Sequence, residues 1–309
     1  MTLHTLSHSD RTAFGIRAIV CAVFLMAAQD ALIKLLSGGP TLWQIWTIRG
    51  VIVVPLFAGL AALSNGRIQW REIFSFWVLV RSLFLAAMYV ALYAVLPVLP
   101  LASAAAGYYT GPLFITVLSA FLIGEKVSGH GWAAVAVGFA GTLILLQPGT
   151  ATFQMQMLAP VLSGFLYALA AMLTRTRCRE TSILTLAVSL NVVLMFAGAG
   201  ISLLLLIVKP VSGTNLGGPT QFLLGSWADL GAPDFLLIVV LAVLMLGIGI
   251  GLAAAYQSAA PAIIAPFDYS YLIFAALFGL LLFQDIPSFA TMAGMLLIAG
   301  GGYLATRAA

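Results

Sequence analysis

Apolar residues occur along this chain in ten long runs, separated by short segments rich in charges, prolines, glycines, serines and asparagines. Runs of about 20 apolar residues have the length that a helix needs to cross the hydrocarbon core of a bilayer. Strands are excluded because lipid cannot satisfy an exposed sheet edge, and these runs are about twice as long as barrel strands. The pattern therefore predicts an all-α integral membrane protein whose spanning helices cover residues 16–37, 41–63, 73–96, 101–123, 129–147, 157–177, 182–208, 234–257, 261–283 and 288–306.

Composition agrees with a membrane-embedded chain. Of the 309 residues, 62% are hydrophobic and 7% are charged, whereas a soluble domain carries about 25% charged residues. This balance excludes a soluble enzyme, a fibrous protein and a disordered tail. The net charge of +4 does not indicate a nucleic-acid partner, because the basic residues are scattered at the ends of apolar runs instead of forming a stripe. The expected partner is the lipid bilayer.

The basic residues also predict the orientation, because loops on the cytoplasmic side are enriched in Lys and Arg. If the N-terminus lies inside, only Lys34 and Lys209 fall on the outer side. The basic residues that then fall on the inner side are Arg11, Arg17, Arg67, Arg71, Lys126, Arg175, Arg177, Arg179 and Arg307. We therefore expect residues 1–15 to form a cytoplasmic tail, both termini to be cytoplasmic, and residues 209–233 to form an irregular or amphipathic loop on the outer face.

An internal repeat divides the predicted helices into two groups of five. Residues 160 positions apart match along the fourth, fifth, ninth and tenth spans, in the pairs Ala102/Ala262, Ala105/Ala265, Tyr109/Tyr269, Phe114/Phe274, Leu122/Leu282, Glu125/Asp285, Ala133/Ala293 and Gly141/Gly301. A second offset of 141 places the first span on the sixth and pairs Lys34 with Arg175. Because five is an odd number, the repeats 16–147 and 157–306 must enter the membrane from opposite sides. Inverted repeats are typical of transporters that alternate between outward-open and inward-open states.

Several motifs carry a resemblance to a known family. They are Gln29-Asp30-Ala-Leu-Ile-Lys34, Trp43-Gln44 with Arg49, Arg81-Ser-Leu, Pro100-Leu-Ala-Ser-Ala-Ala-Ala with Gly111-Pro112-Leu-Phe, Gly124-Glu125-Lys126, and Ala265-Pro266-Phe267-Asp268-Tyr269. With these motifs the chain resembles the EamA-type ten-helix members of the drug/metabolite transporter superfamily over nearly its whole length. It departs from the family where Gln284-Asp285 replaces the Gly-Glu turn of the second repeat.

The resemblance implies a carrier in the bacterial inner membrane, monomeric or weakly dimeric, with a central cavity lined by both halves. Similar members export amino acids or take up riboflavin, S-adenosylmethionine or carnitine-like cations. The expected function is therefore secondary transport of a small polar or amphipathic metabolite by alternating access. The alternatives are a quaternary-cation or drug exporter, which is expected to keep an unpaired acidic residue in its cavity, and a membrane assembly factor that transports nothing.

Four ionisable residues fall within the predicted spans, where an unpaired charge costs several kcal/mol. Equal depth along their helices suggests two ion pairs, Asp30 with Arg49 and Asp268 with Arg81. These pairs would act either as gates and substrate anchors or as static braces. We favour a brace for Asp30 and Arg49, and a site for Asp268 and Arg81, because Pro266 interrupts regular winding beside Asp268. An Arg could instead hold a substrate carboxylate through two hydrogen bonds.

Tyrosines at helical spacing suggest an aromatic wall for a flat or cationic ligand. The candidate wall residues are Tyr89, Tyr93, Tyr108, Tyr167 and Tyr256, with Gln29 as a further polar candidate. Tyr109 is expected to lie at the membrane interface or to pack helices, whereas Trp43 and Trp46 are expected to lie at the membrane interface. The sequence contains no assembly of residues typical of a catalytic, cofactor or metal site, so we expect neither enzyme activity nor a cofactor.

Overall fold

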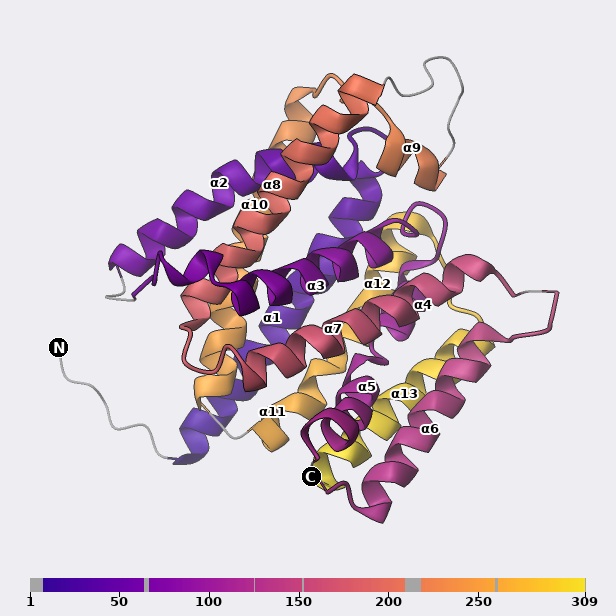
Figure 1. Cartoon of the computed structure of the whole chain (residues 1–309). Coiled ribbons are helices and arrows are strands. Elements are labelled where there is room, and N and C mark those ends of the chain that lie inside the picture. The colour runs from indigo at the N-terminus through magenta and orange to yellow at the C-terminus, as the bar shows by residue number, and fades with distance from the viewer. Residues whose placement is uncertain are drawn as a thin grey trace.

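The computed structural model describes residues 8–63, 67–124, 126–151, 153–208, 218–258 and 261–308, and the described chain is built from helices (Figure 1). The helices of the first half are α1 (His8–Leu36), α2 (Leu42–Leu63), α3 (Phe76–Tyr93), α4 (Leu101–Tyr108), α5 (Gly111–Leu118) and α6 (Gly129–Leu146). Those of the second half are α7 (Leu158–Thr176), α8 (Ile183–Val208), α9 (Gly218–Leu224), α10 (Ala232–Ser258), α11 (Pro261–Asp268), α12 (Ser270–Phe283) and α13 (Phe289–Ala308). The predicted spans match these helices to within a few residues at each end, except that α1 begins at His8, eight residues before the predicted start at residue 16 and within the predicted tail 1–15.

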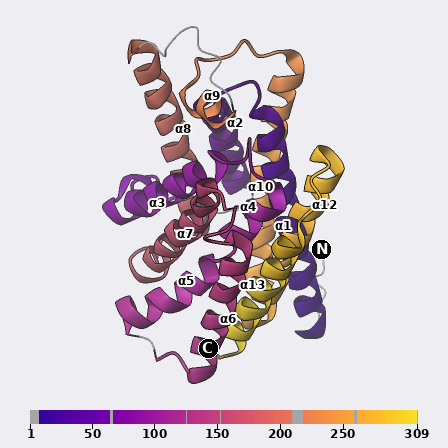
Figure 2. The ribbon, with the colours of Figure 1, turned by 90° about the vertical axis from the view of Figure 1, so that its right-hand side faces the viewer.

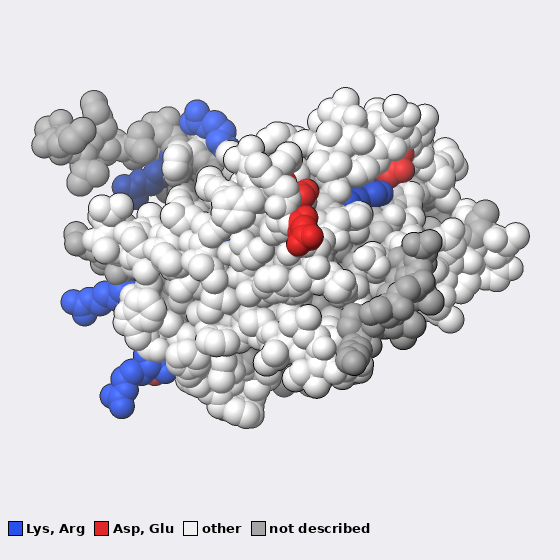
Figure 3. All heavy atoms as spheres, turned by 90° about the horizontal axis from the view of Figure 1, so that it is seen from above, with Lys and Arg blue, Asp and Glu red and all other residues white. Residues whose placement is uncertain are grey.

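Length and apolar surface together define a membrane protein. Within the described ranges, 9 helical segments are long and apolar enough to cross a bilayer, and a shorter apolar helix at Phe289–Leu304 supplies the tenth span. Large apolar side chains such as Leu63, Phe196 and Leu296 lie exposed on the outside of the bundle, where lipid would cover them. Figure 3 shows one face that is mostly uncharged, with several basic side chains along one edge.

The fourth and ninth spans are each broken in the middle, at equivalent places. The break between α4 and α5 falls at Tyr109 and Thr110, just before Pro112, and the break between α11 and α12 falls at Tyr269, just after Pro266. The bounds of α11 lie 160 residues after those of α4, which is the offset of the sequence repeat. These breaks support the predicted repeat, although the repeat boundaries at 16–147 and 157–306 stay a prediction.

Helix packing follows the same symmetry. Helix α6 packs along α13, and α2 along α8, so corresponding helices of the two halves pair with each other (Figures 1 and 2). Helix α1 packs against α10 and α12, and its counterpart α7 packs against α3 and α5. Exchanging the first five spans with the second five leaves this pattern unchanged. Helices α1 and α7 thus pack against helices of the opposite half, and together with the α6–α13 and α2–α8 pairs they join the two halves.

The long loop before α10 is tied to the bundle. Residues 209–217 lie outside the described residues, and the rest of the predicted 209–233 loop contains α9 followed by irregular chain. The Gln44 side chain exchanges two hydrogen bonds with the backbone of Ala228, at 2.8 and 3.0 Å. These bonds hold the loop against the start of α2.

The two tryptophans of α2 are buried. Trp43 is 8% exposed and donates from Nε1 to the Leu223 carbonyl at 2.6 Å, while Trp46 is 1% exposed. The prediction that both lie at the membrane interface is therefore wrong, because α9 and the chain after it cover this end of α2.

We predict that Gly301 is required for the contact between α6 and α13. A Cβ atom at Gly301 would lie 2.7 Å from the Ala134 carbonyl oxygen and from the Gly138 nitrogen, whereas a Cβ at Gly300 would meet nothing within 4 Å. Gly301→Ala should therefore destabilise the protein by about 1–3 kcal/mol through overpacking. Gly300→Ala is the control and should be neutral or slightly stabilising. Thermal unfolding of the purified protein in detergent measures both, and equal melting temperatures for the two variants would contradict the prediction.

Candidate functional site

A buried carboxylate joins the two halves near the middle of the bundle. Asp30 of α1 is 6% exposed, and its Oδ1 accepts a hydrogen bond from the Tyr93 hydroxyl of α3 at 2.9 Å. Its Oδ2 accepts a hydrogen bond from the Tyr271 hydroxyl of α12. Gln29 donates from Nε2 to the Tyr93 hydroxyl at 3.4 Å. One carboxylate thus connects three helices, two from the first half and one from the second.

The predicted ion pair between Asp30 and Arg49 does not form. Among the described residues, the one ion pair within 4 Å joins Lys34 to Asp285. Arg49 of α2 is 2% exposed and acts electrostatically on Asp30 and Tyr89 without touching either carboxylate oxygen of Asp30. The tyrosine hydroxyls at both oxygens explain the difference, since they satisfy Asp30 without the guanidinium.

The predicted pair between Asp268 and Arg81 is also absent from the described ion pairs. Arg81 instead donates from Nε to the Thr174 hydroxyl at 2.8 Å and from Nη1 to the Leu186 carbonyl at 3.3 Å, which ties α3 to α7 and α8. Asp268 is half-buried at the end of α11, where its backbone carbonyl accepts from the Tyr109 hydroxyl at 3.2 Å. The partners of Arg81 and Asp268 thus differ from the predicted ones, and the depth of both charges in the membrane stays a prediction.

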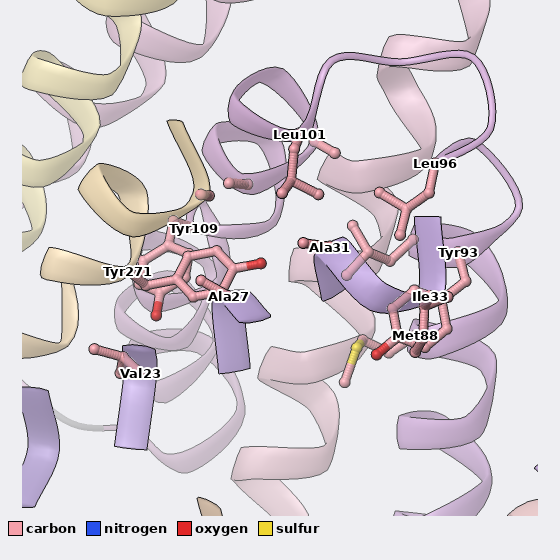
Figure 4. Close-up of a cluster of buried hydrophobic side chains, with 14 of the residues drawn as sticks. Val23, Ala27, Ala31, Ile33, Met88, Tyr93, Leu96, Leu101, Tyr109 and Tyr271 are labelled. Carbon is pink, nitrogen blue, oxygen red and sulfur yellow. The ribbon is translucent and has the colours of Figure 1, made fainter. Parts of the chain in front are cut away.

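Tyrosine rings connect these charges. The ring centroids of Tyr89 and Tyr93 are 5.3 Å apart, and those of Tyr108 and Tyr167 are 5.7 Å apart. Tyr109 lies at the break between α4 and α5 and stacks on Tyr271, with centroids 4.8 Å apart (Figure 4). We call this group the central cluster, and its members are Gln29, Asp30, Arg49, Arg81, Tyr89, Tyr93, Tyr108, Tyr109, Tyr167, Asp268 and Tyr271.

Most of the predicted site residues meet in the central cluster, and two members were missed. Tyr256 lies in α10, but its side chain is outside the described part of the structure. Tyr271 was not selected from the sequence, although it stands three residues after Asp268 in the same Pro-containing motif. Tyr109 was expected to serve packing alone, yet it touches the backbone of Asp268 as well as the Tyr271 ring.

A second polar contact joins the halves at the predicted outer end. Lys34, in the last turn of α1, pairs with Asp285 at 2.8 Å and donates to the Leu99 carbonyl at 2.8 Å. The same ammonium lies 4.7 Å from the centre of the Phe283 ring. In the sequence analysis, Lys34 served only as one of the basic residues that predict the orientation of the chain. The contact ties the end of α1 to the loops that follow α3 and α12.

Metal and disulfide chemistry receive no support from the described side chains. No group of three or more His, Cys, Asp or Glu residues within the described ranges could hold a metal ion. Cys21 is exposed, Cys178 is buried, and both are free thiols.

Ten apolar spans with a polar, aromatic cluster between two equivalent halves define a multi-pass membrane protein of the transporter class. A family model described as the EamA-like transporter family matches residues 13–147. The chain belongs to this family. A solved crystal structure of 21% sequence identity shares the fold with a TM-score of 0.61, over 98% of this chain and 100% of that chain.

Similar proteins of known function are also transporters. A "Riboflavin transporter" of Rhizobium johnstonii is 30% identical over 74% of this chain and 67% of its own length. A "Riboflavin transporter" of Vibrio cholerae is 27% identical over 78% of this chain and 74% of its own length. An "S-adenosylmethionine uptake transporter" of Rickettsia bellii is 23% identical over 66% of this chain and 62% of its own length.

We predict that the Tyr271 hydroxyl stabilises the folded protein and that the neighbouring Tyr269 hydroxyl does not. Tyr271→Phe removes a donor from the buried Asp30 carboxylate and should cost about 1–3 kcal/mol. Tyr269→Phe is a matched control, because the buried Tyr269 hydroxyl has no hydrogen-bond partner among the described residues. Thermal unfolding in detergent compares the two variants. A Tyr269→Phe variant as unstable as Tyr271→Phe would contradict the prediction, because loss of a hydroxyl would then be equally costly without the Asp30 hydrogen bond.

Proposed function

We propose that the protein is a secondary transporter that carries a small polar or amphipathic metabolite across the bacterial inner membrane by alternating access. One observation carries the proposal, namely that the broken helices of the two halves meet beside the central cluster, where the ring of its member Tyr109 lies 5.5 Å from the Tyr269 ring. Broken helices expose backbone polar groups at membrane depth, and secondary transporters bind substrates at such places. Both termini are cytoplasmic in this proposal, as the basic residues predict.

The chemistry of the central cluster fits a ligand with a ring or a charged group. Tyr89, Tyr108 and Tyr167 are only half-buried although they lie between helices, and in this proposal their rings contact the substrate. Tyrosine offers stacking and cation–π contacts of about 0.5–2 kcal/mol each, together with a hydroxyl. Riboflavin and S-adenosylmethionine, the compounds in the relatives' names, both have ring systems and polar groups. The cluster lies within one chain, so a monomer can carry out transport.

The competing proposals have weaker support. A quaternary-cation exporter gains from the lack of an ion pair between Asp30 and Arg49. However, both Asp30 oxygens already accept tyrosine hydrogen bonds, and two guanidinium groups in the same cluster would repel a simple cation. An assembly factor has no need for open polar groups between two symmetric halves. A carrier without a catalytic step is the better proposal.

We predict that Asp268 is required for transport but not for folding. In proteoliposomes preloaded with unlabelled solute, counterflow of labelled riboflavin, S-adenosylmethionine and amino acids identifies the solutes that are carried. Asp268→Asn should lower the counterflow rate about tenfold or more, the loss expected when one charged contact to substrate disappears, with the melting temperature unchanged. Asp229→Asn, at an exposed position in the loop after α9, is the matched control and should transport normally. Counterflow of none of these solutes would overturn the proposed function.

We predict that the contact between Lys34 and Asp285 opens during transport on the outer side. Lys34→Cys with Asp285→Cys is made in a background in which Cys21 and Cys178 are replaced by Ala. A membrane-impermeant bis-maleimide added outside intact cells should cross-link the two cysteines and stop transport, because the joined halves cannot separate at this end. Each single-cysteine variant serves as a control for simple alkylation. Cross-linking only from the cytoplasmic side would contradict the orientation, and full transport by cross-linked protein would contradict the opening.

A further inference from the structure

Tyr109 and Tyr269 occupy equivalent places in the two halves. Each lies at the break of a spanning helix, Tyr109 between α4 and α5 and Tyr269 between α11 and α12. The two positions are 160 residues apart, which is the offset of the sequence repeat. Their ring centroids lie 5.5 Å apart, so the two breaks lie close together. If the two halves exchange conformations during alternating access, these two tyrosines exchange their surroundings.

Each break also leaves one backbone carbonyl without its helical donor. In a continuous helix the Asp268 carbonyl would accept from the Leu272 N–H, but this N–H donates to the Tyr269 carbonyl at 3.1 Å. The equivalent carbonyl, 160 residues earlier, belongs to Tyr108, and its helical donor would be at Pro112, which has no N–H. Both breaks thus present a backbone acceptor at the residue before the tyrosine.

The two tyrosine hydroxyls differ in the described structure. The Tyr109 hydroxyl donates to the Asp268 carbonyl at 3.2 Å. The Tyr269 hydroxyl is buried, has no hydrogen-bond partner among the described residues, and lies against Gly302 of α13, where an added Cβ would overlap it. A buried hydroxyl without a partner is costly. If the halves exchanged conformations, the Tyr108 carbonyl would become its acceptor.

We propose that Tyr109 and Tyr269 form alternative hydrogen bonds, one in each of the two transport states. In the described state Tyr109 donates to the Asp268 carbonyl, and in the opposite state this bond is broken and Tyr269 donates to the Tyr108 carbonyl. The Tyr108 carbonyl oxygen now faces Gly164 of α7, where an added Cβ would lie 2.7 Å from it, so the exchange turns it from α7 toward α12. The proposal rests on the proposed transport function and names groups that stabilise its two states.

The described state has the predicted outer end closed, because Lys34 pairs with Asp285 there. Tyr109 also stacks on Tyr271, with centroids 4.8 Å apart, whereas the equivalent of Tyr271 in the first half is Gly111, which has no ring. The stacking therefore favours the described state over the opposite one. Removing a hydroxyl should shift the equilibrium between the states in a direction that depends on which tyrosine loses it.

Spin labels at Gly38 and Ile286 measure this equilibrium. Both residues are exposed, and they follow α1 and α12 near the ion pair at the predicted outer end. A Cβ at Gly38 would meet nothing within 4 Å. The two positions are labelled as cysteines in the background in which the native cysteines are replaced by Ala. Distances from pulsed electron paramagnetic resonance, on protein in lipid nanodiscs, give the fractions of molecules with this end closed and open.

The two single variants should shift the equilibrium in opposite directions. Tyr109→Phe should raise the ratio of open to closed molecules about threefold or more, because the closed state loses a hydrogen bond. Tyr269→Phe should lower this ratio by a similar factor, with the melting temperature unchanged. The double variant loses one bond in each state and should return to nearly the wild-type ratio. Because both substitutions keep the ring, a purely structural role of the rings would not produce this pattern.

Three results would overturn the proposal. They are equal ratios in all four proteins, shifts of both single variants in the same direction, and a double variant that shifts further than either single variant. Should Tyr109→Phe not fold, the shift in Tyr269→Phe alone decides the outcome. Counterflow by the wild-type protein, measured separately, distinguishes this failure from failure of the transport function, because a protein that transports and gives one of these results keeps its function without the alternative hydrogen bonds.

Discussion

Hydrocarbon offers no hydrogen bonds, and this constraint determines how polar groups are arranged in the bundle. The Asp30 carboxylate shows the consequence most directly, because its two oxygens recruit hydroxyls from Tyr93 and Tyr271. These bonds connect α1 and α3 of the first half to α12 of the second. Removing the Asp30 carboxylate, or the hydroxyl of Tyr93 or Tyr271, would leave a buried polar group without its hydrogen-bond partner. The two hydrogen bonds on Asp30 thus hold α1, α3 and α12 together at the central cluster.

The central cluster contains two kinds of charge. Asp30 and Arg81 are hydrogen-bonded to protein groups on other helices, so these bonds connect the helices that carry them. Arg49 and Asp268 form no ion pair with described residues, although they lie in the same cluster. Buried charges that lack an ion pair are costly in a membrane protein, which is why such residues are candidates for contact with a substrate.

Packing divides the molecule into firm and separable contacts. Along α6 and α13, Gly141 and Gly301 allow the two backbones to approach so closely that an added Cβ would overlap the neighbouring chain. Such contacts resist movement because close-packed surfaces do not deform gradually. The contact between Lys34 and Asp285 is different, since an ion pair at a helix end can separate when water reaches it. The two halves are therefore held closely together along α6 and α13, and by a more easily separated ion pair at the end of α1.

The sequence by itself predicted the apolar spans and the family, which are confirmed, and it also predicted two equivalent halves and the depth of each intramembrane charge. These properties depend on the length of apolar runs and on position along a helix, which are local. Only the tertiary structure decided which charges pair, because side chains at one depth can face different neighbours around the helix axis. Asp30 therefore meets Tyr271 rather than Arg49, and Lys34 meets Asp285, 251 residues later in the chain. Contacts between residues so distant depend on how whole helices pack, and no local pattern of residues encodes that packing.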